Sequence, residues 1–269
     1  MRCTEAVRTL SPRRFLVAGV GIVGLAAIGA FLAHTVLGSS PPPLTLSSAK
    51  ATGMPAATPK PSDPLSAACG PPAKTKSSQG LSGAWLVQPG GQAGYRAHEK
   101  WVGVTAPGDA VARTSGVRGW ALITDSGGIN LQQACFAVEL MTLKSQDQVP
   151  RQNMNDRDEN VHDFLHARSH PYAIFRAANA RLFSERPSGS QAHLRVDGSI
   201  EINARSRPAS ISADVALNGD QLNLAGNAVV VSTDYGLELP TIGDFVEVDP
   251  RITVEFSVSL QRADVAAAS

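Results

Sequence analysis

Apolar and polar residues alternate strictly along residues 252–260, near the end of the chain. Ile, Val, Phe, Val and Leu occupy every second position, and Thr, Glu and Ser stand between them. A period of two is typical of a β-strand with one buried face. The same alternation recurs in residues 196–202 and 211–217, and the next turn is marked by Asn218-Gly219. Several short strands separated by such turns predict an all-β sandwich or barrel.

One segment has a helical period instead. Residues 156–166 place Val161, Phe164 and Leu165 at i, i+3 and i+4, and acidic residues crowd the first turn. We therefore predict one all-β domain over residues 81–262 that contains a single short helix. Residues 263–269 are expected to form a C-terminal tail.

The N-terminal region contains a long apolar run. Residues 15–37 carry no formal charge, four arginines lie within residues 1–14, and no charge follows before Lys50. About 20 apolar residues span a bilayer as a helix, and positive flanks stay inside. The sequence predicts a single-pass transmembrane helix in the cytoplasmic membrane, with a cytoplasmic N-terminus and an extracytoplasmic domain on the periplasmic or cell-wall side. The alternative is a cleaved signal peptide, whose apolar region is normally about 7–15 residues long.

Residues 38–80 have the composition of a linker. They hold nine of the 18 prolines, many Ser, Ala and Thr, and no aromatic residue. Such a segment buries too little apolar surface to offset its ordering entropy, so we expect a disordered linker. A flexible coil of that length spans roughly 35 Å.

Charge and motifs exclude several functions. Residues 81–262 contain 16 Lys and Arg against 20 Asp and Glu, a net charge of −4. Nucleic acid is a poor partner for such a domain. Residues 81–262 contain no G-x-S-x-G, H-E-x-x-H, P-loop or G-x-G-x-x-G motif. We expect neither enzymatic activity nor a cofactor.

The chain has three cysteines: Cys3, Cys69 and Cys135. Cys3 would lie in the reducing cytoplasm, whereas Cys69 and Cys135 would share an oxidising compartment. These two residues can form a disulfide between linker and domain, or remain two free thiols.

A weak metal candidate lies on the predicted helix. Asp158, His162 and His166 follow one another at four-residue intervals and so share a helix face, where a carboxylate and two imidazoles suit Zn²⁺. Solvated surface histidines are the more ordinary interpretation.

An ordered set of short motifs resembles the YceI-like family of bacterial polyisoprenoid-binding proteins. These motifs are Gly83-Ala-Trp85, Gly94–Ala97, Thr114–Val117 with Gly119, Phe136–Leu140, Leu143–Ser145, Arg157-Asp158, His170–Phe175, Gly198–Ile202, Arg207-Pro208, Asp234–Leu237 with Pro240, and Phe256 with Leu260. No single motif is specific, but together they cover nearly all of residues 81–262 in order.

The resemblance implies an eight-stranded antiparallel, lipocalin-like β-barrel that holds an extended amphiphile, such as an isoprenoid quinone or a polyprenyl chain. An eight-stranded barrel has room for one slender ligand. Inward-facing Gly94, Ala97, Gly119 and Gly198 would leave space for the tail. The residues expected to line the lumen are Tyr95, Ala97, Val117, Gly119, Phe136, Val138, Phe164, Phe175, Val196, Ile200 and Phe256.

We therefore expect a membrane-anchored, extracytoplasmic protein that stores or carries a polyisoprenoid-type lipid. The alternative is a module of the cell envelope that has a filled barrel, binds no ligand and contacts other proteins. A metal- or lipid-dependent enzyme is a third reading, for which the sequence offers no motif.

Overall fold

The computed structural model describes residues 40–48, 63–73, 80–101, 108–147, 153–183, 191–238 and 246–263. The expected cytoplasmic segment and transmembrane helix therefore lie outside the described residues, as does most of the C-terminal tail. No helix within the described ranges has the length and hydropathy needed to cross a membrane.

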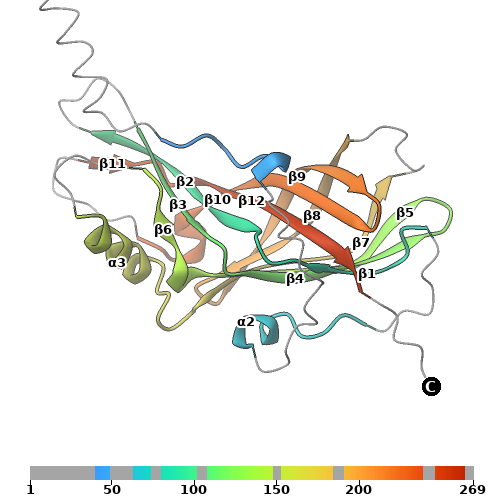
Figure 1. Cartoon of the computed structure of the whole chain (residues 1–269). Coiled ribbons are helices and arrows are strands. Elements are labelled where there is room, and N and C mark those ends of the chain that lie inside the picture. The colour runs from blue at the N-terminus through green and yellow to red at the C-terminus, as the bar shows by residue number, and fades with distance from the viewer. Residues whose placement is uncertain are drawn as a thin grey trace, which may run out of the picture.

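Strands dominate the described part of the chain, as the alternation predicts (Figure 1). The elements are η2 (Leu46–Ser48), α2 (Pro64–Ala67), β1 (Gly83–Val87), β2 (Gln92–Trp101), β3 (Gly108–Thr114), β4 (Val117–Asp125), β5 (Ile129–Glu139), η3 (Leu140–Thr142), β6 (Lys144–Ser145), α3 (Met154–Phe164), β7 (Tyr172–Phe183), β8 (Gln191–Ile202), β9 (Arg205–Asn218), β10 (Gln221–Val231), η4 (Ser232–Tyr235), β11 (Val246–Val248) and β12 (Arg251–Arg262).

These strands form a closed eight-stranded antiparallel barrel, which confirms the predicted fold class. Three of the eight barrel strands are interrupted. β1 and β2 both pair with β12, and they pair in turn with β4 and β3. β5 and β6 continue the next barrel strand, and β11 adds a short pairing to the end of β2. The pairing of β1 with β12 closes the barrel.

One seam of the barrel is much shorter than the others. β7 and β8 are each 12 residues long, but they pair only between Ile174–Arg176 and Ser199–Glu201. Beyond Arg176, β7 continues to pair with β5, and β8 pairs with β9 over its whole length. The two strands therefore diverge toward the β7–β8 connection.

Helix α3 lies at one end of the barrel, beside β6 (Figure 1). The Asn153 side chain accepts a hydrogen bond from the Asn155 backbone N–H and so caps the first turn. Leu165 is the C-cap, and the helix ends there because His166 has a φ of 53°, which is not a helical value. We call this end of the barrel, which also carries β11 and the β11–β12 turn, the α3 end.

Two segments of the expected linker lie against the barrel. Residues 40–48 run along its outer face, and residues 63–73, which include α2, lie on the opposite side (Figure 1). Leu65 packs into an outer apolar cluster with Leu86 and Trp120. For these two segments the structure differs from the expected free coil, because side chains of the barrel bind their backbone and Leu65. Composition does not record such partners.

Candidate functional site

The barrel encloses an elongated apolar cavity of about 350 Å³. Along β10 its wall runs from Leu222 to Val230, and along β12 from Ile252 to Leu260. At roughly 3.3 Å per residue, each of these rows is about 26 Å long. The wall is almost entirely aliphatic and aromatic, which is typical of sites for apolar ligands.

The structure brings most of the predicted lumen residues together on this wall. They are Tyr95, Ala97, Val117, Phe136, Val138, Phe164, Phe175, Val196, Ile200 and Phe256. Several of them, such as Phe136 and Val138, are only half-buried although they point inward. The reason is that one side of each faces the cavity instead of a packed neighbour.

Gly119 and Gly198 do not line the cavity, which corrects the expectation that they leave room for a lipid tail. A Cβ at Gly119 would stand 2.9 Å from Phe136 Cδ1, and one at Gly198 would stand 2.8 Å from Phe175 Cε2. The rings of Phe136 and Phe175 therefore occupy the space above the two glycines. Gly94 and Ala97 do belong to the cavity wall, as expected.

A buried ion-pair cluster fixes α3 across the end of the cavity. Arg157 donates to Asp147 Oδ2 at 2.6 Å and to Glu99 Oε1 at 3.2 Å. Asp147 in turn accepts from the Val111 backbone N–H at 2.9 Å, so the cluster ties α3 to β2 and β3. Burial disfavours the charged guanidinium, but the Glu99 and Asp147 carboxylates outweigh it and raise the pKa of Arg157.

Tyr95 lies beside this cluster and also lines the cavity. Burial raises the pKa of the Tyr95 hydroxyl well above its usual range; Arg157 acts in the opposite direction, and Asp147 and Glu99 add to the increase. The hydroxyl therefore stays neutral at physiological pH. The cavity thus has a weakly polar end against α3.

Ser232 is a second polar residue of the cavity wall. The residue is 2% exposed, and its Oγ is buried without a hydrogen-bond partner among the described residues. An unpaired buried hydroxyl costs about 1–3 kcal/mol, so it marks a place where a bound molecule can supply the missing partner. The sequence offered no signal for Ser232, since its neighbours Val231 and Thr233 show no motif.

The weak metal candidates are not assembled into a site. Asp158 accepts from the Ser145 backbone N–H at 2.8 Å and pairs with Lys144 at 3.2 Å. His162 Nε2 lies 3.2 Å from the Leu143 carbonyl oxygen, to which it must donate, while His166 is exposed. In the described part of the chain no group of three His, Cys, Asp or Glu residues could hold a metal ion. Asp158 and His162 instead fasten α3 to the strand beside it.

Cys69 and Cys135 form a disulfide, with an S–S distance of 2.08 Å, and so adopt the paired one of the two alternatives left open by the sequence. The bond attaches residues 63–73 to the outer face of β5. Neighbouring contacts hold the same segment: Trp120 Nε1 donates to Gly70 O at 2.9 Å, and Arg118 Nε donates to Asp63 at 3.2 Å.

A protein-family model matches more than half of this chain. The family model described as the YceI-like domain matches residues 106–260. None of the curated proteins matches the chain.

Several solved structures resemble this chain to different degrees. A polyisoprenoid binding domain from Saccharophagus degradans, implicated in plant cell wall breakdown, is 12% identical, with a TM-score of 0.50 over 68% of this chain and 99% of that one. BcnA from Burkholderia cenocepacia is 13% identical, with a TM-score of 0.43 over 62% and 95% of the two chains. The YCEI protein of Campylobacter jejuni is 15% identical, with a TM-score of 0.39 over 54% and 81%. At 12% identity and a TM-score of 0.50, the likeness to the Saccharophagus degradans domain shows a similar fold and nothing more.

Proposed function

This chain belongs to the YceI-like family, a family of binding proteins and not of enzymes, and from that premise we propose that its barrel binds the tail of a polyisoprenoid-type lipid. The observation that carries the proposal is the elongated apolar cavity inside the barrel. A filled barrel, which the alternative of a ligand-free envelope module requires, would lack that space.

The energetics of the cavity favour a long apolar chain. Burial of each CH₂ group contributes roughly 0.8 kcal/mol, so a chain that follows a wall about 26 Å long gains affinity from area alone. Aromatic side chains such as Phe136, Phe175 and Phe256 add flat surfaces against which an unsaturated chain can pack. Binding by area explains why the wall needs few polar groups.

The polar end of the cavity favours a ligand with a neutral head group. Arg157, the cation at this end, already pairs with two carboxylates, Asp147 at 2.6 Å and Glu99 at 3.2 Å. A phosphate would add further negative charge to this region, whereas an alcohol or a quinone adds none. Ser232 and Tyr95 are the hydroxyls that would bond such a head. We therefore expect a polyprenyl alcohol or an isoprenoid quinone to bind better than a polyprenyl phosphate.

The location of the protein is part of the proposal. Residues 15–37 would anchor it in the cytoplasmic membrane with the barrel outside the cytoplasm. The disulfide between Cys69 and Cys135 supports an oxidising compartment for the barrel. An anchored barrel would store or carry a membrane lipid close to its source.

Mass spectrometry of lipid extracted from the protein, purified from its own host, tests the proposal. We expect a stoichiometric polyisoprenoid. Leu224→Trp fills the cavity from β10 and should abolish that signal. Val229→Trp is the matched control, because Val229 lies on the same strand and is 49% exposed on the outside. It should leave the bound lipid unchanged.

A second experiment tests the head group. The purified protein is emptied of lipid and offered polyprenyl alcohol, isoprenoid quinone and polyprenyl phosphate with tails of equal length. Preference for the phosphate would contradict the neutral head, while leaving the tail site intact. If no lipid is extracted and none of the three binds, the lipid-binding proposal itself fails.

A further inference from the structure

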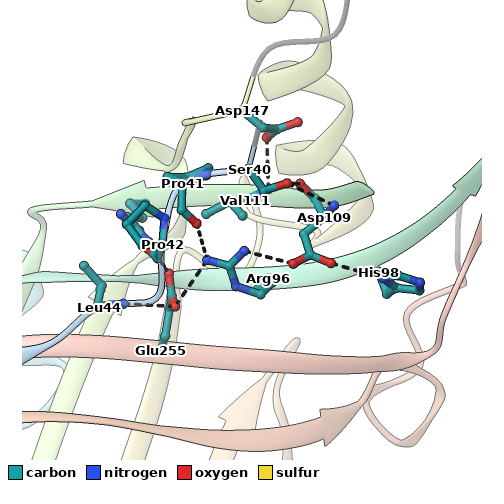
Figure 2. Close-up of polar contacts among 11 residues, drawn as sticks. Ser40, Pro41, Pro42, Leu44, Arg96, His98, Asp109, Val111, Asp147 and Glu255 are labelled. Carbon is teal, nitrogen blue, oxygen red and sulfur yellow. Dashed lines mark hydrogen bonds and ion pairs between the residues drawn. The ribbon is translucent and has the colours of Figure 1, made fainter. Parts of the chain in front are cut away.

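We call residues 40–48 the strap; it crosses the outer face of the barrel, first over β2, β3 and β12 (Figure 2), and ends in the short helix η2. Arg96 Nη2 donates to the Pro41 carbonyl at 2.7 Å, and Arg113 Nη2 donates to the Pro42 carbonyl. A proline has no N–H but keeps its carbonyl acceptor, and its fixed φ favours an extended chain. The strap therefore offers carbonyl acceptors to the two arginines, and because its prolines already restrict the backbone, it loses little conformational entropy when it binds them.

The two arginines belong to an ion-pair cluster under the strap. Glu255 is 4% exposed, and its Oε1 accepts from Arg113 Nη2 at 2.8 Å. Its Oε2 accepts from the Leu44 backbone N–H at 3.3 Å (Figure 2). Arg96 pairs with Asp109 at 3.0 Å. The strap thus covers a charged cluster and takes part in its hydrogen bonding. Removing the strap would leave Glu255 without one of its partners.

Both ends of the strap are fixed as well. Ser40 Oγ donates to the Asp109 carbonyl at 2.8 Å, and the Asp109 N–H lies 3.1 Å from the same Oγ (Figure 2). Near the other end, Ser257 Oγ donates to the Thr45 carbonyl at 2.7 Å. Contacts along the whole segment, and not a single bond, hold it in place.

The position of Ser40 limits where the barrel can be. Asp109, the partner of Ser40, opposes His98 in the β2–β3 ladder. The carbonyl of His98 accepts a hydrogen bond from the Asp249 N–H in the β11–β12 turn, so Ser40 lies at the α3 end. Only two residues separate Ser40 from position 37, where the predicted transmembrane helix ends. Three consecutive Cα steps span at most about 11 Å, whatever conformation they adopt.

We propose that the strap holds the α3 end of the barrel against the membrane surface, within about 11 Å of the end of the anchor. The inference rests on the anchor in the proposed function, but not on the identity of the lipid. It replaces the tether of roughly 35 Å, which a 43-residue coil would provide, with a short and directional one. The partner is the head-group layer of the bilayer, and the Asn218 end of the barrel projects away from it.

Quenching of two fluorescent probes tests this orientation. In a Cys3→Ser background, the full chain carries a probe at Glu247→Cys on β11 or at Asn218→Cys at the opposite end; both residues are exposed. Each protein is reconstituted in phosphatidylcholine and phosphatidylglycerol vesicles that contain a head-group spin label. We expect several-fold stronger quenching at position 247 than at position 218.

Two further variants separate the strap from the anchor. A Gly/Ser insertion between Ser39 and Ser40 leaves the strap residues intact but lengthens the tether, so the difference between the probes should disappear. Leu44→Asp places a second carboxylate beside Glu255 and should have the same effect, whereas Leu44→Met should keep the difference. Equal quenching at both positions in the parent chain overturns the proposal, as does a difference that survives the insertion. A chain that does not insert into the vesicles also overturns the proposal, because the anchor on which it rests is then absent. The lipid-binding proposal would survive that result if lipid is extracted from the barrel.

Discussion

The ring of Phe136 lies directly over Gly119, its cross-strand partner in the β4–β5 ladder. A Cβ at position 119 would stand 2.3 Å from the Cys135 carbonyl oxygen and 2.9 Å from the ring, closer than real contacts allow. The glycine thus admits an aromatic ring to the wall of the cavity and shapes the site without touching its contents.

Gly119→Ala should therefore destabilise the protein by about 1–3 kcal/mol, the usual cost of overpacking a core. Urea unfolding of the parent and the variant measures the change. Gly108→Ala is the matched control, because a Cβ there meets nothing within 4 Å. Equal stability of the two variants would show that the ring moves aside without cost.

Ser232→Ala should have opposite effects on stability and on binding. Without ligand, removal of an unpaired buried hydroxyl should leave the free energy of unfolding unchanged or slightly increased. Affinity for the lipid should fall by roughly fivefold to tenfold, which corresponds to one hydrogen bond of about 1–1.4 kcal/mol. Ser259→Ala is the control, since Ser259 Oγ bonds Asn223 Oδ1 at 2.6 Å and does not line the cavity. It should lower stability and leave affinity unchanged.

Replacement of both Cys69 and Cys135 by Ala should lower the free energy of unfolding by about 2–4 kcal/mol, since the disulfide closes a long loop of the unfolded chain. Thermal unfolding under oxidising conditions measures the loss. The barrel should still fold and bind lipid, because the bond lies on its outer face. A reducing agent should lower the Tm of the parent and leave that of the variant unchanged.

Arg157→Ala should be among the most destabilising single changes, at about 3–5 kcal/mol, because it leaves Asp147 and Glu99 without their shared guanidinium. Arg157→Lys keeps the charge but loses the two-pronged geometry, so we expect an intermediate loss. Chemical denaturation gives both values. If the two variants lose equally little, the cluster does not hold α3 in place.

Acid should weaken the fold through Asp109 and Asp158. Burial alone would raise the pKa of each carboxyl, but hydrogen bonds from His98 and Arg96 to Asp109, and from Ser145 and Lys144 to Asp158, outweigh it and hold both pKa values below the usual range of an aspartate. A lowered carboxyl pKa stabilises the folded state above the unfolded pKa, and this contribution is lost as pH falls through the folded pKa. Stability measured against pH should therefore be constant around neutrality and decline below about pH 4. Asp158→Asn should flatten that decline.

Much of this fold could be predicted from the periodicity of the sequence, and what could not be predicted has physical reasons. Alternation identifies the inward side of a strand such as β12, since side chains there repeat every two residues. It does not say what covers an inward glycine, so the ring over Gly119 could not be foreseen. The spacing of Asp158 and His162 placed them on one helix face, but their backbone partners lie on another element.

Contacts between segments that are distant in the sequence could not be predicted either. The composition of residues 38–80 indicates disorder, because the segment has few apolar side chains to bury. Pro41 and Pro42 are nevertheless held by Arg96 and Arg113, which lie more than fifty positions further along the chain. Similarly, the pairing of Cys69 with Cys135 depends on a distance that only the folded chain defines.

The short seam between β7 and β8 has a mechanical consequence. Opening the wall there separates only the pairs between Ile174–Arg176 and Ser199–Glu201, fewer than along any neighbouring seam, and leaves the β5–β7 and β8–β9 ladders intact. Local opening follows the fewest lost contacts. If the wall opens at this seam, a long, flexible ligand can enter the barrel sideways along its whole length and need not be threaded in from one end.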